Sequence, residues 1–294
     1  MDREVARTLP VADWAGPFAP QEQEAALAAL EAGQVLVLPL LAFRPLPAER
    51  DLLGAQALDG ARKNISLDPA TGTLGGSALG GAERAAMAAM LGRFAEQAQT
   101  LLCGLLPRYA PALERARTSF RPAEIAGRSA APRKDDTRLH VDAFPTRPQR
   151  GRRILRVFAN IAPDGAPRDW RVGEPFPDFA AQFLPRVRAG LPGQGWVMQR
   201  LGLTRGRRAP YDFLMLGLHD AAKLDGDYQA RAPSASLSFP AGTVWLCFTD
   251  AVLHAATAGH CALEQTFHLP VAAMAEPERA PLRVLERLAG RPLA

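Results

Sequence analysis

The chain has 294 residues, 48% of them hydrophobic, so it can bury a large core as one domain. Its net charge of +5 comes from arginine, because lysine occurs only at positions 63, 134 and 223. This Arg-, Ala-, Gly- and Pro-rich composition is typical of a GC-rich genome, so the basicity alone does not indicate nucleic-acid binding. The three cysteines are far apart, and neither a signal peptide nor a membrane-spanning run is evident. We therefore expect a cytoplasmic protein that is at most peripheral to a membrane.

The first 117 residues are predicted to form a mostly helical support region. Helix formers fill 21–32 and Gly33 ends that run, while the Gly-rich stretch 68–81 has no phosphate-binding pattern and is interpreted as a mobile connection or a lid. The remaining elements expected here are a buried strand at 35–41, a short helix at 48–58, and two helices within 83–117 that break between residues 104 and 107.

From residue 118 onward, short apolar stretches alternate with turns rich in Pro, Gly and Arg. Strands are predicted at 118–121, 137–143, 153–161, 195–202, 234–238, 243–248, 252–256 and 264–272, with helical inserts at 177–189 and 209–224. Many short strands without alternating helices favour an antiparallel barrel or sandwich with the N-terminal helices packed outside. We expect a single domain over 1–294, with a strand-rich core at 118–275 and a C-terminal helix within 276–294.

A possible metal site begins with the segment RLHVDAF, residues 138–144. His140 and Asp142 are two residues apart, so on an extended strand both side chains point to the same face. An imidazole and a carboxylate on one face suit a divalent metal, but such a pair often arises by chance. A third ligand from another strand is needed to support the hypothesis.

His254 is the best candidate for that third ligand. It follows a Pro-Gly turn, a buried strand and a second short turn in FPAGTVWLCFTDAVLHAATAG, residues 239–259. Two imidazoles and one carboxylate occupy one face of an octahedron and leave the other face open, as in non-haem Fe(II) oxygenases. The alternative is a histidine of the core or of a turn. His260 and His268 are weaker candidates, and either of them fits a surface position.

The motifs HVDAF, RILRVFANIAP and FPAGTVWLCFTDAVLHAATAG followed by EQTFHLP resemble the double-stranded β-helix of Fe(II)/2-oxoglutarate dioxygenases. In detail they resemble bacterial hydroxylases of Kdo, 3-deoxy-D-manno-oct-2-ulosonic acid. The resemblance covers most of the chain, including residues 28–43. It implies that His140, Asp142 and His254 hold Fe(II), that 2-oxoglutarate and O₂ are co-substrates, and that C3 of a lipid A-linked Kdo is hydroxylated to give Ko at the cytoplasmic face of the inner membrane.

The distal carboxylate of 2-oxoglutarate needs a cation, and here the chain departs from the commonest pattern. Many relatives carry Arg on the last core strand, whereas this chain has Glu264-Gln265-Thr266. Arg156 is the best substitute if its strand face points inward, because a buried guanidinium requires an anion and its planar fork suits a carboxylate. If that face is the outer one, Arg156 is solvated instead. Further candidates for binding 2-oxoglutarate are Asn160, Thr266, Gln265 and Arg138.

Two basic segments, 147–153 and 200–208, are either solvated loops or contacts for an anionic substrate. Carboxylates and phosphates of a lipid A-linked sugar would suit clustered arginines, as would an anionic membrane surface. We name Arg147, Arg150, Arg207 and Arg208 as candidate substrate-binding residues. No aromatic residues lie within these loops, so nucleic acid is not an expected partner. Two alternatives remain open: a dioxygenase for another small-molecule or protein substrate, and a non-catalytic metal- or sugar-binding β-barrel.

Overall fold

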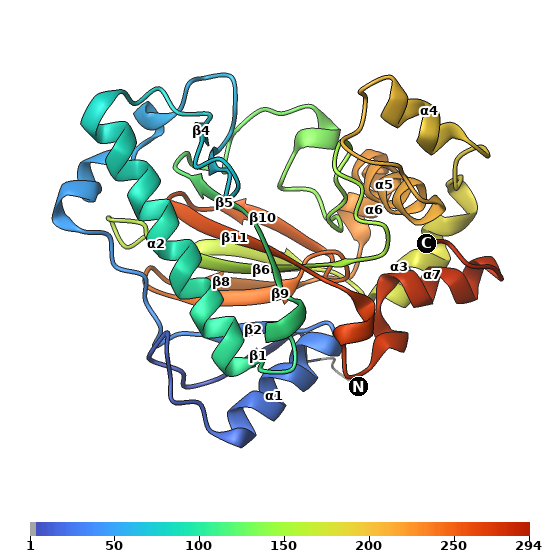
Figure 1. Ribbon diagram of the computed structural model, residues 1–294, viewed down its shortest axis with the longest axis horizontal. Coiled ribbons are helices and arrows are strands. Elements are labelled where there is room, and N and C mark those ends of the chain that lie inside the picture. The colour runs from blue at the N-terminus through green and yellow to red at the C-terminus, as the bar shows by residue number, and fades with distance from the viewer. Residues whose placement is uncertain (1–3) are drawn as a thin grey trace.

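Two β-sheets form the centre of the computed structural model, which describes residues 4–294 (Figure 1). The larger sheet has the strand order β1-β2-β9-β6-β11-β5-β3-β4, and the smaller has the order β10-β7-β8. All neighbouring pairs are antiparallel except β1 with β2. The strands are β1 (Ala6–Thr8), β2 (Val35–Leu38), β3 (Ile65–Leu67), β4 (Leu74–Gly75), β5 (Glu114–Arg121), β6 (Arg153–Asn160), β7 (Arg168–Val172), β8 (Ala235–Phe239), β9 (Val244–Phe248), β10 (His254–Ala258) and β11 (Ala262–Leu269).

Aromatic side chains from both sheets pack together between them. Trp245 of β9 stacks on Phe239 of β8 and on Phe158 of β6, with ring centroids 4.1 and 5.3 Å apart. Trp170 of β7 meets the same group edge-on. Because these contacts join the two sheets, the interior is a closed aromatic layer, as expected for a jelly-roll core with alternating inward residues.

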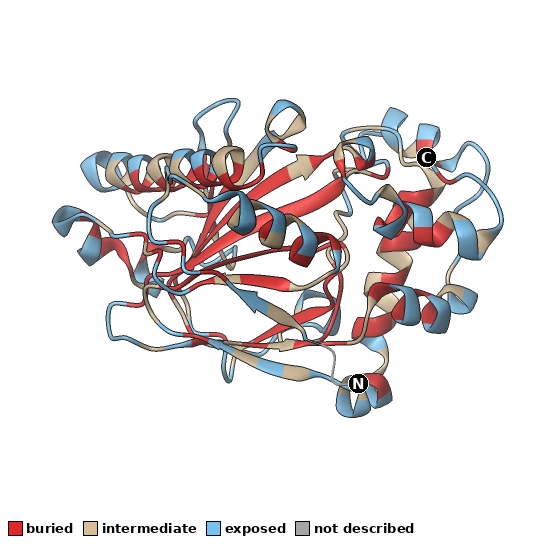
Figure 2. Ribbon diagram, turned by 90° about the horizontal axis from the view of Figure 1, so that it is seen from below, coloured by how far each residue is buried: buried red, intermediate tan, exposed pale blue. Residues whose placement is uncertain are grey.

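Helices cover the outer face of the large sheet and one end of the molecule (Figures 1 and 2). They are α1 (Pro20–Glu31), α2 (Gly81–Leu105), α3 (Phe176–Phe183), α4 (Gln194–Arg200), α5 (Pro210–Leu224), α6 (Gly226–Arg231) and α7 (Pro281–Ala289). The long helix α2 contacts β5 and β11 through residues spaced three or four apart, among them Met87, Met90, Leu91 and Phe94. Helices α3, α5, α6 and α7 contact one another at the end where α4 also lies.

Several sequence predictions were wrong in type. The segment 195–202, predicted as a strand, lies mostly within helix α4. The second helix expected before residue 117 does not form: α2 ends at Leu105 and β5 starts at Glu114, because Pro107 and Pro111 interrupt the chain between them. Strand β7 was missed because two arginines and an aspartate hide its alternation, in which Arg168, Trp170 and Val172 are buried.

The N-terminal region is less helical than predicted. It supplies β1 to β4 and the start of β5 to the large sheet, so the boundary expected at residue 118 falls inside a strand. Part of the Gly-rich stretch 68–81 forms the β3–β4 hairpin. At the other end of the chain, α7 covers only part of the predicted C-terminal helix and follows a 3₁₀ turn at Pro277–Arg279. Within residues 4–294, none of the helices combines the length and the apolar character needed to cross a bilayer.

Candidate metal centre and ligand cavity

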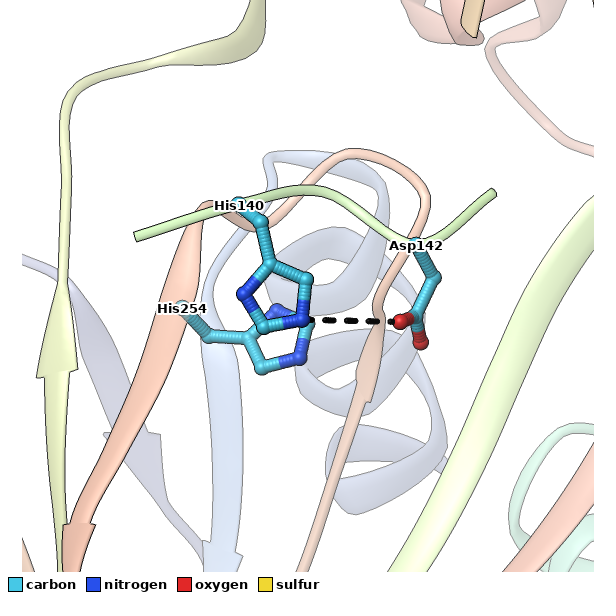
Figure 3. A group of neighbouring side chains, drawn as sticks. All are labelled: His140, Asp142 and His254. Atoms are coloured by element: carbon cyan, nitrogen blue, oxygen red, sulfur yellow. Dashed lines mark ion pairs between the residues drawn. The ribbon is translucent and has the colours of Figure 1, made fainter. Parts of the chain in front are cut away.

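The structure brings His140, Asp142 and His254 together. His140 lies in an extended segment that forms an isolated bridge with His254 at the start of β10, through two backbone hydrogen bonds of 3.1 and 2.9 Å. The backbone N–H of Asp142 donates to the carbonyl of Thr249 at 2.8 Å. These bonds hold the two chain segments in register, so one potential ligand atom from each side chain lies within 4.8 Å of the other two (Figure 3).

Backbone carbonyls set the orientation of both histidines. Nδ1 of His140 lies 2.7 Å from the carbonyl oxygen of Arg138, and Nδ1 of His254 lies 2.9 Å from that of Val252. A carbonyl only accepts hydrogen bonds, so in each neutral ring Nδ1 carries the proton and Nε2 keeps its lone pair. Such outer contacts commonly fix the tautomer of metal-binding histidines. Nε2 of His140 lies 3.9 Å from Oδ1 of Asp142.

The charge states of the three groups suit a divalent cation. Burial lowers the pKa of His140 and of His254, so both rings are neutral at pH 7. Burial alone would raise the pKa of Asp142, but the Arg156 guanidinium, together with a hydrogen bond from Thr249 and other neighbouring groups, outweighs it and the pKa falls to about 2. Oδ2 of Asp142 is buried without an aligned hydrogen-bond donor, although Nη2 of Arg156 lies 3.0 Å away. Two neutral imidazoles and one ionised carboxylate therefore fit a metal ion.

A cavity of about 510 Å³ opens in front of these three side chains. Its wall carries more positive than negative groups: the cations are Lys63, Arg121, Arg133, Lys134, Arg156, Arg168 and Lys223, and the carboxylates are Asp136, Asp142, Asp220 and Glu264. Phe158, Trp170 and Trp245 form the apolar part. Trp170 stacks on the ring of His254 with a centroid distance of 5.0 Å, which connects the metal centre to the aromatic layer. The excess of cations suits anionic ligands.

Arg156 faces the cavity, which is the inward of the two orientations left open by the sequence, but its charge is already neutralised. One guanidinium nitrogen is paired with Glu264 and another with Asp142. Glu264 also accepts from Arg121 at 3.1 Å. Burial favours the protonated form of Glu264, yet these two arginines keep its pKa below the usual value. Arg156 thus belongs to an ionic network that supports Asp142.

Arg168 and Lys223 are two cavity cations that the sequence analysis did not select. Arg168 on β7 is 3% exposed, donates to the carbonyl of Gly259 at 2.6 Å, and has a buried Nε without a hydrogen-bond partner. Lys223 on α5 is 2% exposed, and among the described residues its Nζ donates only to the carbonyl of Arg133 at 3.5 Å. Within residues 4–294, neither cation has a carboxylate within 4.0 Å. Two signals in the sequence could have found these residues. The alternation of β7 places Arg168 on a buried face, and the rarity of lysine singles out Lys223.

The other residues proposed for 2-oxoglutarate do not line this cavity. The side-chain amide of Asn160 is engaged by three backbone groups, and that of Gln265 bonds Thr118 and two backbone carbonyls. Arg138 donates to the carbonyl of Lys223 at 2.8 Å and pairs with an aspartate. Thr266 is buried beside them on β11. Arg147, Arg150, Arg207 and Arg208, proposed for substrate binding, also lie outside the cavity wall.

The remaining histidines differ in position. His260 lies between Glu124 and Asp164, and His268 is partly buried near Phe144, so neither joins the three-residue cluster. His219 of α5, which sequence reasoning passed over, lines the cavity. Its ring packs edge-on against His140 at 5.1 Å, and its Nδ1 lies 2.8 Å from the carbonyl of Val141.

Comparisons with known proteins agree with this geometry. The family model described as 3-deoxy-D-manno-oct-2-ulosonic acid (Kdo) hydroxylase matches residues 13–292. No curated protein sequence matches the chain. Crystal structures of the Kdo hydroxylase KdoO, a non-heme Fe(II) alphaketoglutarate dependent dioxygenase, are similar at 44% identity over 98% of this chain and 97% of theirs. The TM-score is 0.94 for the complexes with alphaketoglutarate and Fe(III) and with succinate and Fe(III), and 0.95 for that with cobalt(II).

The agreement extends over nearly the whole of both chains, so it includes the helices that surround the sheets as well as the double-stranded β-helix core. The predicted fold class is therefore confirmed, and with it the resemblance drawn from the sequence motifs. This chain belongs to the Kdo hydroxylase family.

Proposed function

We propose that this protein is an Fe(II)- and 2-oxoglutarate-dependent hydroxylase that adds a hydroxyl group at C3 of a Kdo sugar in the lipopolysaccharide inner core, giving Ko. The observation that carries the proposal is the convergence of His140, Asp142 and His254 at the wall of a cation-lined cavity. A facial set of two imidazoles and one carboxylate is the donor set of non-haem iron oxygenases.

His140 and His254 would hold the metal through Nε2, and Asp142 through a carboxylate oxygen. When bound, Fe(II) with 2-oxoglutarate and O₂ supplies the oxidant that converts a C–H bond into C–OH, with release of succinate and CO₂. The chain itself keeps the ligands in the correct ionisation state. Arg156 holds Asp142 as a carboxylate, and the buried carbonyls keep both imidazoles in the metal-binding tautomer.

Arg168 is our candidate for the cation that binds the distal carboxylate of 2-oxoglutarate. Arg156, the choice from the sequence, is paired with Glu264 and Asp142, whereas Arg168 has no carboxylate within 4.0 Å in the described residues and its buried Nε has no hydrogen-bond partner there. Burial lowers the pKa of Arg168 to about 10, which means that its charge is poorly compensated. A bound carboxylate would supply the missing partner through a forked contact. Arg168 lies two residues from Trp170, which stacks on His254, so it faces the same cavity.

We further propose that the substrate is Kdo linked to a lipid A precursor, met at the cytoplasmic face of the inner membrane. Between Asp178 and Asp212 the sequence has no acidic residue. Segment 188–208 within this stretch exposes both apolar and basic side chains, which are Leu191, Trp196, Val197, Leu201, Leu203, Arg188, Arg200, Arg205 and Arg207. Trp, Leu and Arg on one surface suit the interface of an anionic bilayer.

Segment 188–208 also lies next to the cavity. The N–H of Arg205 donates to the carbonyl of Thr146 at 2.9 Å, and the guanidinium of Arg208 donates to the carbonyl of Pro145, which lines the cavity. A bilayer contacted here would bring a membrane-anchored sugar close to the opening.

The proposed function is tested by expressing the protein in a strain that makes Kdo but no Ko and measuring the mass of the lipid A-core. We expect a gain of one oxygen with the wild type and none with Asp142→Ala. An unchanged mass with the wild type, together with purified enzyme that releases succinate without altering Kdo, would assign the dioxygenase to another substrate.

A further inference from the structure

The three lysines of the chain, Lys63, Lys134 and Lys223, all line the cavity that contains the candidate metal centre. Lysines are three of 35 basic residues, so arginine serves nearly everywhere else. The three come from distant parts of the sequence: a loop before β3, a 3₁₀ turn at Pro132–Lys134, and the end of α5. Their convergence points to a local need for a compact ammonium group rather than a broad guanidinium.

The three lysines have different surroundings. Lys63 is paired with Asp136, and Lys134 is an exposed residue of the cavity wall. Lys223 is buried, and within residues 4–294 its Nζ has a single hydrogen-bond partner, the carbonyl of Arg133 at 3.5 Å. A buried ammonium without a carboxylate is costly, and burial lowers its pKa. An anion from outside the chain would remove this cost.

The position of Lys223 separates it from Arg168. Lys223 reaches the cavity from helix α5, together with His219 one turn earlier and with Asp220, which pairs with Arg133 at 3.0 Å. Arg168 reaches it from strand β7, beside the aromatic layer and against the carbonyl of Gly259. The two cations, neither of which has a carboxylate within 4.0 Å in residues 4–294, therefore stand on different walls. Two carboxylates are required in the cavity at once, one from the co-substrate and one from a sugar acid.

We propose that Lys223 binds the carboxylate of the sugar-acid substrate and thereby selects an acidic sugar over a neutral one. This inference rests on the proposed function and adds the residue that recognises the substrate. The carboxylate is attached directly to the anomeric carbon of a 2-ulosonic acid, so an ion pair there fixes one end of the ring. A buried ion pair of this kind also orients the sugar, because the ammonium is held by the helix and by the carbonyl of Arg133.

The test removes the charge from each partner in turn. The protein is loaded with Co(II) in place of iron, to prevent turnover, and with 2-oxoglutarate. It is then titrated with the methyl glycoside of Kdo and with the methyl ester of that glycoside. Fluorescence of Trp170 and Trp245, which line the cavity, reports binding. We expect the wild type to bind the acid at least roughly 30-fold more tightly than the ester. Lys223→Met should weaken binding of the acid by a similar factor and bind the ester no more weakly than the wild type does.

Arg231→Met is the matched control, because it removes one positive charge from an exposed side chain on the next helix, α6. It should bind both ligands as the wild type does. Lys223→Met should keep the wild-type requirement for 2-oxoglutarate in succinate release without sugar, which also verifies that the variant is folded. Any one of three results would overturn the proposal. The wild type could bind acid and ester equally, Lys223→Met could keep the preference for the acid, or that variant could require more 2-oxoglutarate. Selective binding of the acid without hydroxylation would instead refute the proposed function and leave the role of Lys223 intact.

Discussion

Replacing Arg168 with methionine tests how the cavity holds 2-oxoglutarate. The guanidinium is 3% exposed and has one backbone acceptor, the carbonyl of Gly259. Its pKa falls from 12.5 to about 10, mainly because of burial. A fall of that size means that, before any ligand binds, keeping this guanidinium charged in the folded protein costs about 3 kcal/mol. In our proposal the distal carboxylate of 2-oxoglutarate offsets this cost.

Arg168→Met should therefore have opposite effects on stability and on co-substrate binding. Without 2-oxoglutarate, the free energy of unfolding should stay the same or rise, by up to about 3 kcal/mol, because a poorly compensated charge is removed. The 2-oxoglutarate concentration that gives half-maximal succinate release should rise roughly 30-fold or more, since loss of one partner of a buried charge pair costs about 2–5 kcal/mol. Urea unfolding and a succinate assay measure the two effects.

Two control variants separate Arg168 from its neighbours. Arg171→Met changes a partly buried arginine of the same strand that contacts Ser234 and Gln229, and it should keep the wild-type dependence on 2-oxoglutarate. Arg156→Met should instead destabilise the fold by roughly 3–5 kcal/mol, because Glu264 loses a buried partner. If Arg168→Met shows the wild-type requirement for 2-oxoglutarate while Arg156→Met raises it without loss of stability, Arg156 is the co-substrate ligand and our reasoning is wrong.

Three further predictions address the metal, the pH dependence and the membrane. Asp142→Ala should lose both Co(II) binding, measured by visible absorption, and succinate release; retained metal binding would remove Asp142 from the ligand set. Burial lowers the pKa of His268 from 6.5 to about 4, so the unfolded chain takes up its proton first as the pH falls. The free energy of unfolding should thus fall by up to about 3 kcal/mol through this group between pH 6.5 and pH 4. In urea unfolding, His268→Gln should show a smaller fall over the same range. An identical pH profile for the two proteins would contradict this. Trp196→Ser combined with Leu201→Ser should weaken sedimentation with phosphatidylglycerol vesicles at least roughly tenfold, since each apolar side chain contributes about 1.5–3 kcal/mol on burial. Equal sedimentation of both proteins would exclude this surface as the contact.

The sequence was sufficient to find the three potential metal ligands and the class of fold. His140 and Asp142 are adjacent on one face, and His254 follows a recognisable turn and strand, so local alternation reveals them. The bridge between His140 and His254 then needs only ordinary backbone pairing. Strand β7 escaped notice because its pattern RDWRV is mostly charged, and Arg168 was missed with it. Periodicity identifies a buried face by its apolar residues, and here one inward residue is a cation.

Arg156 illustrates a second limit of sequence reasoning. Alternation places it on one face with Phe158 and Asn160 but does not tell whether that face points inward. Its partners are Asp142 in a loop and Glu264 on β11, which is 108 residues away. Whether an inward arginine is free or neutralised depends on such long-range pairs, which a single sequence does not reveal. The four surface arginines suggested for substrate binding failed to line the cavity for a related reason: clustering in sequence does not place side chains on one wall.

The position of Glu264 explains which cavity cations are neutralised within the chain and which stay available for a ligand. Many dioxygenases of this superfamily carry Arg near this place on the last core strand, and here a glutamate pairs with Arg156 and Arg121. That pairing leaves Arg156 to hold Asp142 as a carboxylate and takes both arginines out of competition for the co-substrate. In our proposal the binding of free carboxylates then falls to Arg168 and Lys223, whose side-chain nitrogens have only backbone carbonyls as partners within residues 4–294. Glu264 can thus account for two features of the site. Asp142 stays ionised, and the proposed counter-charge for 2-oxoglutarate is Arg168 on β7.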